Sequence, residues 1–310
     1  MSTAITGLTI GVTGANGFIG SALIPLLESR GHTVIRIARA VGTRDSALGT
    51  RQVVWDPERN MLDPAALEGI DGVCNLAGEN IGQRWTPDVK RRIVESRVQS
   101  TELIARTMAS LSPRPGVLVN MSAVGIYGNR HDEPADERSW PGKGFLVEVV
   151  EAWEAATRAA SDAGIRVVCA RGGVIMHPSA SILERLIPIF QLGAGGKIAS
   201  GRQWLSWIAR TDMLRALAFL LETESLGGVV NVTSPEPVRN DEFTRVLARV
   251  LHRPALLTVP AVAVKLLYGE MGEETVIGGQ RVLPKRLLEA GFAFQHPDLE
   301  DAIRYELRSR

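Results

Sequence analysis

Short apolar runs rich in Val and Ile alternate with longer amphipathic stretches through the first two thirds of the chain. The short runs are typical of buried strands, and stretches in which apolar residues recur every three or four positions are typical of helices. Because strands and helices alternate, we expect a parallel, doubly wound sheet, and hence an α/β fold of the Rossmann type. Strands are predicted at 8–13, 33–38, 52–55, 72–77, 116–122 and 166–171, and helices at 18–30, 64–67, 88–111 and 145–163.

The pattern is looser after Gly173, where glycine-rich and aromatic segments precede a predicted helix at 211–221 and a strand at 228–233. Asn240 is a favourable N-cap for a helix at 241–251, and a short helix is expected after Pro260. This part is expected to form a smaller C-terminal lobe that binds the substrate. The dinucleotide-binding domain is predicted at 1–174, joined by 205–234, and the substrate-binding lobe at 175–204 and 235–310.

The composition excludes several classes of protein. The 310 residues carry a net charge of +1, which argues against nucleic acid as a partner, since that usually requires a basic face. Cys74 and Cys169 lie far apart in apolar runs, which predicts buried, reduced thiols. No apolar run approaches the ~20 residues of a membrane span, and the first seven residues lack the basic start of a signal peptide. A cytoplasmic protein without membrane contact is therefore expected.

The first predicted strand runs directly into the turn Gly14-Ala15-Asn16-Gly17-Phe18-Ile19-Gly20, and a predicted helix follows. In such a turn one glycine allows the tight bend, one lets the backbone approach a diphosphate, and the last lets the helix pack on the strand. The amides at the start of the helix bind the phosphates. The segment therefore predicts a dinucleotide site that includes Gly14, Asn16, Gly17, Phe18, Ile19 and Gly20.

The end of the second strand indicates which dinucleotide is bound. An acidic residue there binds the free ribose hydroxyls of NAD, whereas an arginine accommodates the 2′-phosphate of NADP. This chain has Arg39 at that point, with Arg44 nearby and no acidic residue before Asp45. The expected cofactor is NADP(H); a solvated loop arginine with no such role is the alternative interpretation of Arg39.

The glycine turn and Asn75-Leu76-Ala77-Gly78 together resemble the extended short-chain dehydrogenase/reductases, in which such a turn ends the fourth strand beside the cofactor. Other segments resemble an atypical branch of that superfamily, the epimerase family of NADP-dependent oxidoreductases. The resemblance covers nearly the whole chain and implies an extended Rossmann fold with a small C-terminal substrate lobe. The segments are 75–81, Arg84-Trp85, Glu95-Ser96-Arg97, Trp153-Glu154-Ala155-Ala156, 201–208 and 278–286.

The resemblance also implies cofactor contacts outside the glycine turn. Besides Arg39, these fall on Leu76, Ala77, Gly78, Arg97 and Ile175, with Arg92 and Glu79 as further candidates.

Members of the wider superfamily that transfer hydride use a serine and a Tyr-x-x-x-Lys pair on one helix. One helical turn places the lysine beside the phenol and lowers the pKa of the phenol, which then exchanges a proton with the substrate oxygen. Ser122 occupies the serine position, but no tyrosine of this chain is followed four residues later by lysine. With Glu154 aligned to the acid that usually follows the pair, the two positions hold Leu146 and Val150. The ordinary mechanism is therefore in doubt.

Three residues are the candidates for catalysis beside the nicotinamide. Ser122 is expected to steady a substrate oxygen. Tyr127 either donates a proton or packs over the pocket. Glu79 either acts as a general acid or base, caps the following loop or binds the substrate. Lys143, between two glycines, fits a solvated loop residue better.

On the substrate side, Arg202, Trp204 and Trp207 follow the last predicted strand of the first domain and are expected to face the cleft. An arginine with aromatic rings suits a planar or anionic ligand, although Trp207 fits the core of the lobe equally well. His131, His177, His252 and His296 have no metal-ligand spacing, so no metal site is expected.

The leading hypothesis is an NADP(H)-dependent oxidoreductase that acts on a small molecule, with Ser122 and Tyr127 at the substrate carbonyl. A non-catalytic NADP(H)-binding sensor or scaffold is the alternative, favoured by the missing Tyr-x-x-x-Lys pair, and a nucleotide-sugar epimerase ranks third. The long helices predicted at 88–111 and 145–163 fit either a monomer or a homodimer.

Overall fold

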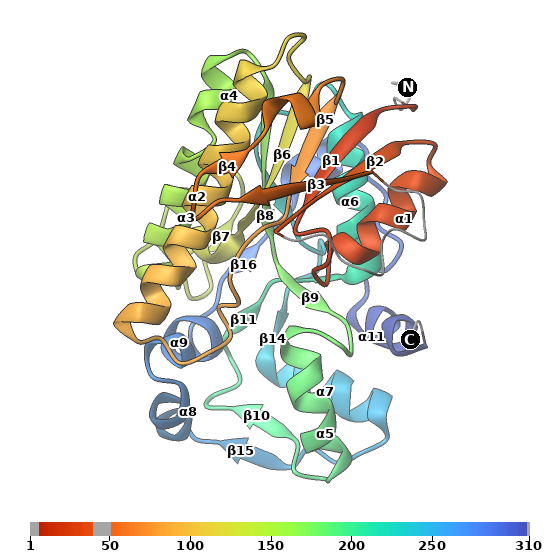
Figure 1. The fold of residues 1–310 in the computed structure, drawn as a ribbon. Coiled ribbons are helices and arrows are strands. Elements are labelled where there is room, and N and C mark those ends of the chain that lie inside the picture. Colours follow the sequence, from red (N-terminus) through yellow and green to blue (C-terminus); the bar gives the residue numbers. More distant parts are fainter. Residues whose placement is uncertain (1–5, 40–50, 309–310) are drawn as a thin grey trace.

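Figure 1 shows the computed structural model, which describes residues 6–39 and 51–308. Eight strands form one sheet in the order β13-β8-β6-β5-β1-β2-β3-β4, and all neighbours are parallel except β3 and β4. All six predicted strands and the strand at 228–233 lie in this sheet, so the Rossmann-type α/β prediction is confirmed. The strands are β1 (Thr9–Thr13), β2 (Thr33–Ala38), β3 (Arg51–Asp56), β4 (Met61–Leu62), β5 (Gly72–Asn75), β6 (Val117–Ala123), β8 (Arg166–Gly172) and β13 (Gly228–Val232).

Helices cover both faces of the sheet, which explains why its strands are apolar on both sides (Figure 1). On one face, α1 (Gly20–Ser29) and α6 (Arg210–Glu222) bury residues such as Leu23 and Leu217 in one apolar cluster with β1 and β8. On the other face, α2 (Pro87–Ser110), α3 (Phe145–Ala155), α4 (Arg158–Asp162) and the short helix η2 (Pro64–Leu67) form a second cluster or pack against it. The carboxyl ends of the strands are not covered by these helices and face the C-terminal lobe.

Two details of the predicted helices are wrong. The helix expected at 145–163 is interrupted between α3 and α4, because the backbone N–H and the hydroxyl of Thr157 both donate to the Glu154 carbonyl and tighten that turn. Asn240 does not cap a helix. It is the first residue of α7 (Asn240–Leu251), and its side chain instead accepts a hydrogen bond from the amide of Ile198 at 2.8 Å.

The C-terminal lobe lies below the carboxyl ends of the large sheet in Figure 1 and is built from short elements. Four two-stranded sheets pair β9 with β12, β10 with β15, β11 with β14, and β7 with β16. Its core gathers Trp207, Phe190, Phe243 and Ile303 from four different elements. The remaining elements are η3 (Val124–Tyr127), β7 (Pro134–Ala135), β9 (Val174–Met176), α5 (Ser181–Gln191), β10 (Gly196–Ile198), β11 (Trp204–Leu205), β12 (Trp207–Ala209), β14 (Val238–Arg239), β15 (Leu257–Val259), α8 (Ala261–Tyr268), α9 (Glu270–Gly272), η4 (Glu273–Ile277), β16 (Arg281–Val282), α10 (Lys285–Glu289) and α11 (Leu299–Arg308).

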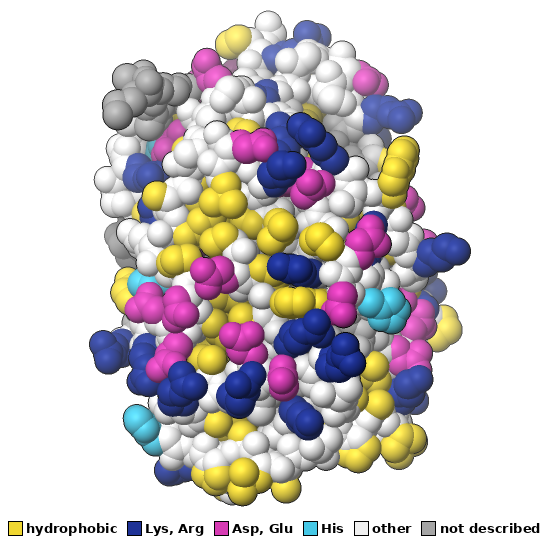
Figure 2. Space-filling model, turned by 180° about the vertical axis from the view of Figure 1, so that it is seen from behind, with side chains coloured by type: hydrophobic (Ala, Val, Ile, Leu, Met, Phe, Trp, Pro, Cys, Tyr) yellow, Lys and Arg dark blue, Asp and Glu magenta, His cyan; other side chains and the backbone are white. Residues whose placement is uncertain are grey.

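On the face shown in Figure 2, acidic and basic side chains are interspersed over the lower half, without a continuous basic stripe. Within 6–39 and 51–308, no helix is long and apolar enough to cross a membrane.

Candidate functional site

The glycine turn is tightly closed after β1. The amide of Gly17 donates to the carbonyl of Gly14 at 2.9 Å, and Gly14 has a φ of +61°, which side-chain-bearing residues rarely adopt. A Cβ on Gly14 would lie 2.9 Å from the carbonyl oxygen of Leu76, and a Cβ on Gly20 would overlap the carbonyl of Gly14. The three glycines therefore bend the turn and let α1 approach β1, as the sequence predicts.

The outer side of the same turn is open. Asn16 and Gly17 are exposed, and Phe18 and Ile19 are half-buried. Within the described residues, the amides of Phe18 and Ile19 donate to no backbone carbonyl, although they lie at the start of α1. Free amides at a helix start are the donors that a bound phosphate accepts from.

The turn after β5 lies directly against the glycine turn and is fixed from below by buried amides and hydroxyls. Thr13 Oγ donates to Asn75 Oδ1 at 2.5 Å and accepts from the amide of Leu76 at 2.9 Å. Asn75 in turn donates to Asn120 Oδ1 on β6 at 2.6 Å. This network sets the carboxyl ends of three neighbouring strands at one level, with Leu76 and Ala77 half-buried and Gly78 exposed at the edge.

Two arginines lie in the last part of β2 and directly after it. Arg39 is exposed just beyond the end of β2. Arg36, which sequence reasoning did not single out, donates from Nη2 to Asn16 Oδ1 of the glycine turn at 3.1 Å. Arg44 and Asp45 lie outside the described residues.

Arg97 supports the turn after β5 from α2. Its Nη1 and Nη2 donate to the carbonyls of Ile93 and Glu79 at 3.0 and 2.9 Å, and its guanidinium lies 5.0 Å from the ring of Trp153. Burial lowers the pKa of Arg97 to about 10, against the opposing charge of Glu79. Both terminal nitrogens are thus bound to backbone, and Gly78 packs against the guanidinium.

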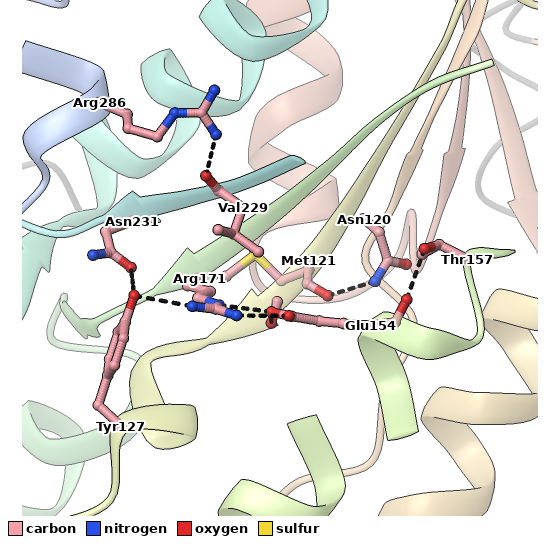
Figure 3. A network of polar contacts seen from close by, with 10 residues as sticks. Asn120, Met121, Tyr127, Glu154, Thr157, Arg171, Val229, Asn231 and Arg286 are labelled. Carbon is pink, nitrogen blue, oxygen red and sulfur yellow. Dashed lines mark hydrogen bonds and ion pairs between the residues drawn. The ribbon is translucent and has the colours of Figure 1, made fainter. Parts of the chain in front are cut away.

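Ser122, near the end of β6, belongs to a polar network beneath the sheet edge, most of which Figure 3 shows. Its hydroxyl donates to Glu154 Oε1 of α3 at 2.6 Å. Glu154 also accepts two hydrogen bonds from Arg171 of β8, both at 2.8 Å. Burial by itself would lower the pKa of Arg171, but the hydrogen bonds and charge of Glu154 outweigh it, so the pKa is raised. The single proton of the Ser122 hydroxyl is therefore directed at a carboxylate.

Tyr127 closes the other end of this network. Its hydroxyl donates to Asn231 Oδ1 of β13 at 2.8 Å and accepts from Arg171 Nη1 at 3.1 Å. The side chain is completely buried, and burial raises the pKa of Tyr127 against the opposing effect of Arg171. Of the two interpretations of Tyr127, packing agrees better with this position than proton donation does.

The positions of the missing Tyr-x-x-x-Lys pair are apolar. Val150 lies in a buried cluster with Tyr127, and Leu146 packs against Gly125 beyond β6. Beside them is a carboxylate that sequence reasoning missed: Glu274 accepts from the amides of Phe145 and Leu146 at 2.8 and 3.0 Å and so caps α3. No spacing rule connects residue 274 to residue 145, so the sequence carried no signal for it.

Glu79 is the least constrained of the three catalytic candidates. Its backbone amide donates to Ser96 Oγ at 3.1 Å, which fixes the loop. Within the described residues, its half-buried carboxylate accepts one side-chain hydrogen bond, from Gln83 Nε2 at 3.3 Å. Lys143 follows Gly142 in the loop before α3.

The three residues predicted to contact the substrate have different surroundings in the structure. Trp207 is completely buried in the lobe core, where its Nε1 donates to the carbonyl of Glu236 at 2.8 Å, so the packing interpretation applies to it. The Trp204 ring contacts the guanidiniums of Arg239 and Arg281, whose central carbons are 4.5 and 4.9 Å from its centroid. Arg202 is exposed nearby.

Ile175 is half-buried on β9, which pairs with β12 beyond the end of β8. Among the residues that the structure describes, no three His, Cys, Asp or Glu side chains are grouped so that they could hold a metal ion.

Comparisons with known proteins agree with this geometry. Residues 10–233 match the model of the NAD dependent epimerase/dehydratase family, and residues 259–306 match a domain of unknown function. The chain is 41% identical over 297 residues to an epimerase family protein of Mycobacterium bovis, with 96% of each chain covered. It is 37% identical to a chloroplastic epimerase family protein of Arabidopsis thaliana, with 96% of this chain and 86% of that protein covered.

A solved structure of the human epimerase family protein SDR39U1 with NADPH superposes with a TM-score of 0.88 at 31% identity, covering 98% of this chain and 100% of that one. The glycine turn, the turn after β5 and the C-terminal lobe all fall within the matched lengths. The chain belongs to the NAD dependent epimerase/dehydratase family.

Proposed function

We propose that this protein binds NADP(H) along the carboxyl edge of the sheet. The glycine turn, with the free amides of Phe18 and Ile19, receives the diphosphate. Arg39 at the end of β2 receives the 2′-phosphate, and Leu76 and Ala77 line the adenosine side. The human relative, whose structure contains NADPH and superposes on 98% of this chain, supports the same choice of cofactor.

We propose further that the cofactor serves hydride transfer to or from a small molecule held between the sheet edge and the C-terminal lobe. NADPH, when bound, supplies hydride to a carbonyl carbon, and the carbonyl oxygen must then receive a proton. Glu79, in its protonated form, is the proposed proton donor to the carbonyl oxygen, because its carboxyl group lies in the loop after β5 with one weak partner, Gln83 Nε2. Ser122, whose proton points to Glu154, accepts rather than donates at its free lone pairs.

Tyr127 has a positioning role in this proposal. Its hydroxyl links Arg171 to Asn231, so it holds the ends of β8 and β13 beside β6 and does not itself meet the substrate. Arg202 and Trp204 remain the proposed substrate contacts of the lobe, as an arginine beside an aromatic ring suits an anionic or planar group.

A non-catalytic NADP(H)-binding sensor is the second candidate, favoured by one observation. Leu146 and Val150 fill the positions from which other members of the superfamily move a proton, and both pack in apolar surroundings. A nucleotide-sugar epimerase ranks below both, because it requires a group that toggles a proton at a sugar carbon, and the phenol of Tyr127 is buried.

Turnover separates the two leading candidates. Purified protein with NADPH is offered a broad panel of aldehydes and ketones while absorbance at the nicotinamide band is followed. The oxidoreductase predicts oxidation of NADPH by some of them, a large loss of kcat in Glu79→Gln, and retention of kcat in Tyr127→Phe wherever that variant stays folded. Tight NADPH binding without oxidation by the whole panel would instead support the sensor.

A further inference from the structure

A guanidinium without a counter-ion lies against the glycine turn. Arg210 is the first residue of α6, and its guanidinium carbon is 5.4 Å from the centroid of the Phe18 ring. Its Nε is buried and has no hydrogen-bond partner among the residues that the structure describes. Across residues 6–39 and 51–308, no carboxylate oxygen lies within 4.0 Å of its nitrogens, and the guanidinium contacts the aromatic ring of Phe18 instead.

Arg215, little more than one turn further along the same helix, provides a comparison, because it contacts an aromatic ring and also has hydrogen-bond acceptors. Its guanidinium carbon is also 5.4 Å from an aromatic centroid, that of Phe292. Unlike Arg210, it donates from Nη1 to Asp212 Oδ1 and to the carbonyl of Ala293, both at 2.8 Å. The contact with the ring is thus shared by the two residues, and the absence of an acceptor is peculiar to Arg210.

The two acidic groups closest to the start of α6 along these contacts, Glu306 and Asp212, do not pair with Arg210 within the described residues. Glu306 accepts from the amide of Thr211 at 2.8 Å, and its other oxygen lies 4.0 Å from His177 Nε2. Asp212 accepts from two backbone amides of the segment before α11, besides Arg215. Neither carboxylate neutralises Arg210, so its charge is available to a ligand.

A partly buried cation without an acceptor is unfavourable unless something negative joins it. Beside Arg210 the chain presents a glycine turn with two free amides at the start of α1. Amides and guanidinium together match the oxygens of a diphosphate, since a guanidinium binds phosphate through several donors at once. We infer that Arg210 binds the diphosphate of the dinucleotide from the side of α6, opposite the amides of the glycine turn.

This inference rests on the proposed cofactor but adds a residue from a different element, more than 190 positions beyond the glycine turn. The unpaired, buried Nε of Arg210 destabilises the ligand-free protein, and a bound diphosphate would relieve this. Removing the guanidinium should therefore weaken cofactor binding without weakening the fold, a combination that a purely structural arginine would not give.

The test is a set of calorimetric titrations of Arg210→Met, with Arg215→Met as the matched control. The ligands are NADPH, NADH and adenosine 2′-phosphate, which lacks the diphosphate. For Arg210→Met we expect NADPH and NADH to bind about 10- to 100-fold more weakly, with the ratio of the two affinities unchanged. Adenosine 2′-phosphate should bind as to the parent protein, and the ligand-free thermal midpoint should not fall.

Arg215→Met should give the opposite result, a lower thermal midpoint with cofactor affinity retained. Unchanged NADPH affinity in Arg210→Met would overturn the inference, and so would an equal loss of affinity for adenosine 2′-phosphate. If the parent protein binds neither dinucleotide, the proposed function fails, and this inference fails with it.

Discussion

Glu154 and Arg171 face each other across the boundary between α3 and β8 and form a two-point ion pair, with Nε to Oε1 and Nη2 to Oε2 both at 2.8 Å. The side chains are 16% and 9% exposed, so water hardly screens them. Ser122 and Tyr127 are bound to opposite ends of the pair. The positions of the Ser122 and Tyr127 hydroxyls therefore depend on one buried salt bridge.

Breaking this pair should be costly. Arg171→Met leaves the Glu154 carboxylate buried without its charge partner, and such a loss typically costs about 3–5 kcal/mol of the free energy of unfolding. Urea denaturation of the variant measures it. As a control, Arg91→Met removes the exposed pair with Asp88 and should cost less than about 1 kcal/mol. Equal costs for the two variants would contradict a structural role for the buried pair.

Gly14 is predicted to be irreplaceable for two separable reasons, its positive φ and its contact with Leu76. Gly14→Ala should lower the thermal midpoint and abolish NADPH binding. Gly31→Ala isolates the first reason, because Gly31 has a φ of +85° but nothing within 4 Å of an added Cβ. We expect Gly31→Ala to lose only the roughly 1 kcal/mol of backbone strain and to keep its cofactor affinity. Normal NADPH binding by Gly14→Ala would show that the turn is not the diphosphate site.

The two buried thiols predict a loss of stability at alkaline pH. Burial raises the pKa of Cys74 and of Cys169 from 9.0 to about 12. A group whose pKa is raised in the folded state contributes stability that is complete below its unfolded pKa and is lost as the pH rises toward the folded value. Between pH 8 and pH 10 each thiol should therefore cost about 1.4 kcal/mol.

Urea unfolding at several pH values tests this prediction, with the Cys74→Ala, Cys169→Ala double variant as the control. The decline between pH 8 and 10 should be smaller in the double variant by about 3 kcal/mol. The thiols of the folded protein should also resist aromatic disulfide reagents at pH 8. Rapid labelling of the native protein would show that these thiols are accessible.

The sheet and the glycine turn could be predicted from the sequence because both depend on local patterns. Apolar runs mark the strands, and the spacing of Gly14, Gly17 and Gly20 is itself the signal. The turn after β5 could also be predicted, because its residues Asn75 to Gly78 are contiguous in the sequence.

The rest depends on contacts between distant residues. Glu274 caps α3 across 129 positions, and Arg210 reaches Phe18 from α6, with no spacing that connects either pair. Helix α5 is absent from the predicted elements because Pro188 interrupts its pattern, yet packing in the lobe core stabilises it. Asn240 is a residue type that commonly caps helices, but its side chain accepts a hydrogen bond from Ile198 instead. This contact depends on tertiary structure and has no local signal.

The central claim is the NADP(H) site, and calorimetric titration of the cofactor-free protein with NADPH and with NADH, repeated on Arg39→Ala, tests it most directly. We predict at least a roughly tenfold preference for NADPH in the parent protein, which Arg39→Ala loses while its affinity for NADH stays the same. Equal affinities in the parent protein, or a preference that survives in Arg39→Ala, would contradict the assignment of the 2′-phosphate to Arg39.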